Sequence, residues 1–114
     1  MSDLEQQVLM AAAQAMRAAL FGPIPPWLQS YPVHYTCDVV DDGDRWFDLH
    51  PGGVATVVVC ETPTGELSVD ADVDSGEAAK RARGGPEALR ELAAELLHVA
   101  DLHEQVTRQI AENA

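Results

Sequence analysis

Residues 45–70 read RWFDLHPGGVATVVVCETPTGELSVD, and this segment sets the fold class. The middle of it is apolar without a break, which favours a central strand buried on both faces. Later, Leu67 and Val69 alternate with polar residues, as on an edge strand. The segment thus holds three β-rich runs separated by turns containing Gly and Pro: 45–50, 54–60 and 66–70.

A fourth β-rich run, residues 33–40, precedes these three. It is joined to them through residues 41–44, which contain an Asp-Gly pair. Such a pair is a hairpin signal because its second position tolerates a positive φ, and connections this short join antiparallel neighbours. The four runs therefore predict a four-stranded antiparallel β-meander.

A capping box at residues 2–5 predicts a helix over 3–21, which a Gly-Pro pair ends. Residues 22–32 then carry four prolines, which fix φ and disfavour helix before each of them. This stretch is predicted to be a Pro-rich connector. We expect Trp27 and Leu28 to attach it to the core, although an aromatic residue in such an arm can also bind a partner.

Two more helices are predicted after the strands. Asp74 can cap a short helix over 75–83, with Glu77 at the position that completes a capping box. Residues 84–86, Gly-Gly-Pro, end it and begin a long amphipathic C-terminal helix over 86–113. We therefore expect an α+β fold in which an N-terminal helix, the meander, the short helix and the long helix form one domain over 1–114.

The charge restricts the classes of partner. The chain has 19 acidic and seven basic side chains, a formal net charge of -12, so its mean field repels nucleic acids and anionic membranes. Proteins rich in Lys and Arg would be attracted, although the charge can also serve solubility alone. No apolar run is long enough to span a membrane and no basic segment opens a secretory signal, so we expect a cytoplasmic protein.

The long helix carries apolar residues at alternating spacings of three and four, and its predicted length is about 39 Å. Its first half has a broad apolar face that suits a sheet, and its second half has a narrow one that suits another helix. That helix could be 3–21 of the same chain or the same helix of a second copy. A homodimer is slightly favoured. The predicted interface is Leu96, Val99, His103, Val106 and Ile110.

His103 is the polar member of this seam. Its protonation could make helix pairing sensitive to mild acid, or it could lie at the rim of the helix as an ordinary surface residue.

No pattern nominates a catalytic, cofactor-binding or metal-binding residue. Residues 70–76 resemble the start of a calcium loop but lack its sixth-position Gly and twelfth-position Glu. The four histidines and two cysteines show no local pair at zinc-ligand spacing. Cys37 and Cys60 fall in strand-like runs, and three interpretations stay open: buried free thiols, a bridge, or a metal or redox role. We expect no bound cofactor.

These observations predict a non-catalytic acidic protein-interaction domain, such as an adaptor, an inhibitor or a chaperone-like accessory factor. One variant is an acidic protein that imitates DNA and inhibits a nucleic-acid-binding protein. The alternative is a small-molecule-binding protein or small enzyme with a pocket between the sheet and the long helix. That pocket would be lined by Trp27, Tyr35, Trp46 and Leu96. The order of the elements is common and identifies no family.

Overall fold

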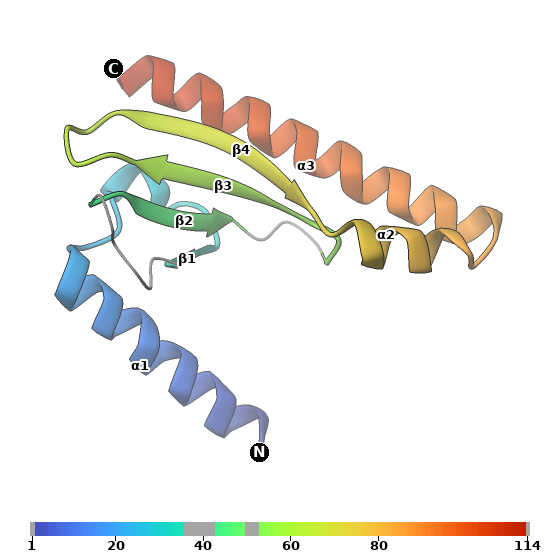
Figure 1. Ribbon diagram of the computed structural model, residues 1–114, viewed down its shortest axis with the longest axis horizontal. Helices are drawn as coiled ribbons and strands as arrows, with labels where there is room; N and C mark the ends of the chain where they lie inside the picture. The colour runs from blue at the N-terminus through green and yellow to red at the C-terminus, as the bar shows by residue number, and fades with distance from the viewer. Residues whose placement is uncertain (1, 36–42, 50–52, 114) are drawn as a thin grey trace.

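Four antiparallel strands form one sheet, in the order β1-β2-β3-β4, and the C-terminal helix packs along one face of it (Figure 1). The computed structural model describes residues 2–35, 43–49 and 53–113. The predicted α+β fold, its meander and the order of its helices are confirmed. The elements are α1 (Asp3–Phe21), η1 (Pro26–Leu28), β1 (Val33–Tyr35), β2 (Arg45–Leu49), β3 (Ala55–Glu61), β4 (Leu67–Val73), α2 (Ser75–Ala82) and α3 (Pro86–Asn113).

Alternation along the strands gives the sheet two unlike faces. One face, here called the core face, carries the buried side chains of Phe47, Leu49, Val57 and Val59. The intervening residues point to the opposite face, here called the open face. The leucine of η1 and the inward residues of α3 belong to the same buried cluster as the core-face residues, so neither element covers the open face.

β3 lies inside the sheet between β2 and β4, and β4 is an edge strand, as predicted. The prediction that β3 is buried on both faces is wrong for one of them. Val57 and Val59 are fully buried on the core face, whereas on the open face Thr56 and Val58 are only half-buried and Cys60, near the end of the strand, is 6% exposed. Apolar residues occur on both faces of β3 because they favour strand structure, but only one of these faces is covered by other elements.

α3 turns every seventh residue towards the core: Leu92, Val99 and Val106. Its first half lies over α2 and its second half follows β4 and β3 (Figure 1). The sequence predicted the reverse, with the broad half on the sheet. Where α3 crosses the strands, Leu102 and Ile110 pack on the core beside the buried valines, whereas the eight-residue α2 leaves much of the broad half uncovered. Leu89, Leu96 and Leu97 are accordingly exposed.

An ion pair joins α2 to α3. Nη1 of Arg81 lies 2.5 Å from Oε2 of Glu95, and both side chains are partly exposed. The hydrogen bond from Arg81 lowers the pKa of Glu95 below its ordinary value and raises that of Arg81. The backbone N–H of Val54 also contributes to the lowered pKa of Glu95. The Arg81–Glu95 pair therefore joins the middle of α3 to α2.

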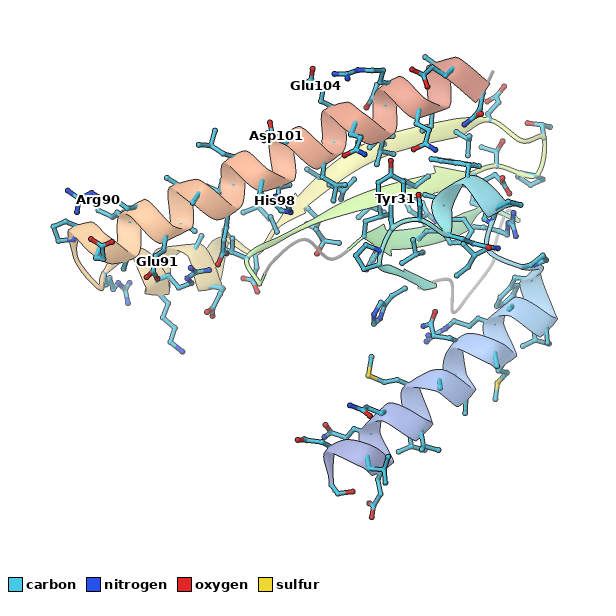
Figure 2. The ribbon with its side chains drawn as sticks, turned by 180° about the vertical axis from the view of Figure 1, so that it is seen from behind. Tyr31, Arg90, Glu91, His98, Asp101 and Glu104 are labelled. Carbon is cyan, nitrogen blue, oxygen red and sulfur yellow. The ribbon has the colours of Figure 1, made fainter. Side chains whose placement is uncertain are left out.

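The Pro-rich connector is attached to the core, as predicted. Leu28 is fully buried in the cluster under the sheet, and Trp27 packs against the same cluster while staying partly exposed. Tyr31, labelled in Figure 2, donates its hydroxyl to the side-chain oxygen of Gln109 on α3 at 2.5 Å. The amide of Gln109 donates in turn to the carbonyl of Trp27. The connector is thus fastened to the far end of α3.

α1 begins and ends as predicted but packs differently. The Ser2 hydroxyl accepts the backbone N–H of Glu5 at 3.2 Å, and Gly22 follows the last turn with φ +97°. No residue of α1 is buried, and the helix projects away from the sheet beside β1 (Figure 1). The expectation that α1 might pair with α3 of the same chain is therefore wrong. Among the described residues, no helix is both long and apolar enough to cross a membrane.

Candidate functional site

Two surfaces stand out from the body of the protein. The first is on α1, where six large apolar side chains are 50–70% exposed. At 100° per residue, most apolar residues of α1 fall within about half of its circumference. We call this half the α1 arc. Its members are Leu4, Val8, Leu9, Ala12, Ala15, Met16, Ala19 and Leu20. Ala12 lies at its centre, both along the helix and around it.

Arg45 sets the direction in which α1 leaves the body. Its Nη1 donates to the carbonyl oxygen of Pro23 at 2.8 Å and approaches that of Phe21 at 3.4 Å. Its Nε donates to Glu61 on β3 at 2.9 Å, and Nη2 pairs with the same carboxylate. The guanidinium also lies over the ring of Phe47, 5.4 Å from the centroid. The junction after α1 is therefore bound to the first residue of β2, and Figure 2 shows α1 held apart from the rest.

The second surface is a hollow of about 430 Å³ on the open face. We call it the Trp46 hollow; it is lined by Trp46, Asp48, Val58, Asp70, Ala71 and Asp72. The register explains its composition, because Asp48 pairs with Val58 and Val58 pairs with Asp70, which places one apolar residue between two carboxylates. Asp72 lies two residues further along β4 on the same face.

The chemistry of the Trp46 hollow favours a cation. Trp46 is 39% exposed, so part of its side chain lies at the surface of the hollow. An indole attracts ammonium and guanidinium groups, and nearby carboxylates add charge-assisted hydrogen bonds to the same groups. Asp70 and Asp72 are exposed, so a cationic side chain can reach both carboxylates from solvent. The hollow can therefore receive a Lys or Arg side chain.

The residues of the predicted α3 interface are divided between the core and the surface. Val99 and Val106 are buried in the protomer and contact the sheet side, so they cannot also contact a second copy. His103 and Ile110 are half-buried and Leu96 is exposed. The hydroxyl of Thr107 lies 3.4 Å from Nδ1 of His103 and donates to its carbonyl oxygen.

The structure does not assemble the predicted pocket between the sheet and α3. Trp46 points to the open face, whereas Leu96 belongs to α3 on the core side. Trp27 lies within η1 and packs on the core cluster. Tyr35 is placed by its backbone at the end of β1, opposite Phe47. Trp46 and Leu96 therefore cannot line one cavity.

The remaining sequence candidates stay apart. Cys60 is buried, whereas Cys37, His50 and residues 41–42 of the predicted turn lie outside the described residues. The acidic run at 70–76 is divided, because Asp74 caps α2 by accepting the backbone N–H of Glu77 at 3.0 Å. Within 2–35, 43–49 and 53–113, no three His, Cys, Asp or Glu side chains converge as a metal site would require.

Three functional features were missed from the sequence: the Arg45 junction, the Tyr31–Gln109 contact and the Trp46 hollow. Arg45 and Glu61 stand at the start and the end of adjacent strands, so a hairpin register would have placed them opposite each other. The same register would have revealed the row across the hollow. Nothing in the sequence signals a contact between residues 78 positions apart.

Comparisons of the chain with models of known protein families, with curated proteins and with solved structures found no match. The site therefore has to be interpreted from its own geometry.

Proposed function

We propose that this chain is a non-catalytic, acidic protein-interaction domain that binds a Lys- or Arg-rich segment of another protein in the Trp46 hollow. The observation that carries the proposal is the combination of an exposed indole with three aspartates around one depression of the open face. The net charge of -12 adds a long-range attraction for the same class of partner.

The spacing of the hollow suits a single cationic side chain. Neighbouring strands lie about 4.8 Å apart, so the backbones of β2 and β4 are separated by about 9.6 Å across β3. Asp48 and Asp70 therefore stand on either side of Val58, whose methyl groups can contact the aliphatic stem of Lys or Arg. Trp46 and Asp72 complete the surroundings. A protein that binds nucleic acid is one partner with such segments, so the DNA-mimic variant is a special case of this proposal.

Oligolysine and oligoarginine peptides of about ten residues serve as probes. Their attraction to the hollow depends on charge, so it can be tested without knowing the sequence of the partner. The Asp70→Asn/Asp72→Asn double variant should weaken peptide binding by about tenfold in 0.1 M salt, measured by calorimetry. Trp46→Ala should weaken the binding of both peptides by about threefold or more.

The matched control is Asp101→Asn/Glu112→Gln, which removes the same charge from exposed positions of α3. This control should change the affinity by less than about twofold, because charges farther away than about 10 Å are screened at 0.1 M salt. Equal weakening by both double variants would show that the peptides respond to net charge alone. Absence of binding at low salt would exclude the proposal.

A further inference from the structure

The α1 arc is an exposed apolar surface that no other described part of the chain covers. We infer that it binds the α1 arc of a second copy, so that two chains associate through an antiparallel pair of α1 helices. This inference is independent of the proposed function, because α1 contributes no residue to the Trp46 hollow. Three observations support a second copy as the occupant.

The first observation is that the open face does not suit the arc. An apolar helix laid on that face would cover the exposed carboxylates of Asp70 and Asp72, and moving carboxylates out of water is costly. The Arg45 junction also holds the end of α1 to β2 and directs the helix outward. An apolar surface of matching length and shape is instead present on a second α1.

The second observation is the pattern of side-chain size along the arc. Ala12 occupies the centre, so two helices related by a two-fold axis through this point can approach closely. Val8, Leu9 and Met16 surround Ala12 and would fill the space beside it. Asp3 points away from the arc, whereas Glu5 lies about 20° from its centre in the first turn, where it would face the small side chain of Ala19 on the second helix.

The third observation concerns area and charge. α1 is about 28 Å long and 10–12 Å across, so half of its surface is roughly 450–540 Å², and a pair would bury roughly 900–1,100 Å². Specific interfaces begin near about 1,000 Å², so the pair reaches the low end and should dissociate in roughly the micromolar range. α1 carries only -1 of the net charge of -12. An antiparallel pair keeps the two acidic bodies at opposite ends, where their repulsion is weakest.

The test is the solution mass by sedimentation velocity over roughly micromolar to hundred-micromolar concentrations, which bracket the expected dissociation constant. The parent chain should pass from one to two chains. Ala12→Glu should weaken the dimer at least about tenfold, because it places a charge at the centre of the arc. The matched control is Gln7→Glu, which adds the same charge about 140° away and should leave dimerisation within about twofold of the parent.

Oxidation by peroxide adds a second measurement on the unmodified chain. Met10 and Met16 are both exposed in the single chain, but Met16 belongs to the α1 arc and Met10 points about 160° away from its centre. In the dimer, Met16 should oxidise more slowly than it does on dilution, whereas Met10 should keep its rate. Equal rates for Met16 at all concentrations would contradict the inference.

Cysteine cross-linking determines the direction of the helices. Ala12→Cys should form a disulfide with its own copy, whereas Leu4→Cys should not, because two such residues lie about 24 Å apart in an antiparallel pair. The parent chain, with its own cysteines, is the blank. Disulfides from both variants would overturn the antiparallel arrangement. A monomer at every concentration, a dimer that Ala12→Glu leaves intact, or a dimer that Leu97→Glu on α3 splits would overturn the inference itself.

Discussion

Two leucines of α3 provide a direct test of how this helix is oriented on the body. Leu92→Ala removes three buried carbons at about 0.8 kcal/mol each and leaves a cavity, so the free energy of unfolding should fall by about 3 kcal/mol. Leu97→Ala is the same change five residues later, but Leu97 is 67% exposed whereas Leu92 is 9% exposed. The loss there should stay below about 0.5 kcal/mol, because Ala also favours helix.

The two variants would be compared with the parent by urea unfolding followed by circular dichroism at one protein concentration. A difference of about 2.5 kcal/mol corresponds to about 10 °C in melting temperature for a domain of this size. The slopes of the unfolding curves should agree, since both variants unfold the same surface. Equal losses for the two leucines, or a larger loss for Leu97→Ala, would refute the packing of α3 described above.

Three further outcomes are expected. Glu95→Gln should destabilise the chain near neutral pH, because the hydrogen bond from Arg81, which lowers the pKa of Glu95, is weakened. The ionised carboxylate stabilises the fold fully above its ordinary pKa of 4.5, and this contribution is lost as the pH falls through the lower pKa that Glu95 has in the folded chain. Thermal unfolding across the acid range measures it, and a constant difference from the parent would contradict it. Tyr31→Phe should cost about 1 kcal/mol in urea unfolding, since it removes the hydrogen bond to Gln109, and an unchanged midpoint would dismiss that contact. Gly22→Ala should lower the melting temperature by the equivalent of about 1–2 kcal/mol, because φ at this position is +97°; a more stable variant would count against that backbone geometry.

The elements of the fold could be predicted from the sequence because their signals are local. The cap at Ser2 and the cap at Asp74 each mark a helix start, and both side chains accept the expected backbone N–H. The Gly and Pro turns separate strands that pair with their neighbours in the chain, so the meander follows without long-range information.

The packing partners of the helices could not be predicted in the same way. Apolar periodicity shows which face of a helix avoids water, but it does not say what covers that face. The narrow seam through Val99 and Val106 favoured another helix as its partner, yet the sheet covers it. The apolar face of α1 gave the same kind of signal, yet the body covers none of it.

The Trp46 hollow depends on the register of the strands, which the sequence pattern alone does not determine. Shifting β2 by one residue against β3 would move Trp46 and Asp48 to the core face. Only the observed pairing of Asp48 with Val58 and of Val58 with Asp70 brings the carboxylates around the indole.

The fastening of the connector to α3 has a kinetic consequence. Tyr31 and Gln109 are 78 positions apart, whereas the hairpins of the sheet close over short loops. Contacts between distant residues are entropically expensive to form first, so the hairpins should precede the docking of η1 in the folding pathway. The side chain of Leu28 would then not yet be packed in the transition state for folding. Leu28→Ala should therefore accelerate unfolding while leaving the rate of folding almost unchanged.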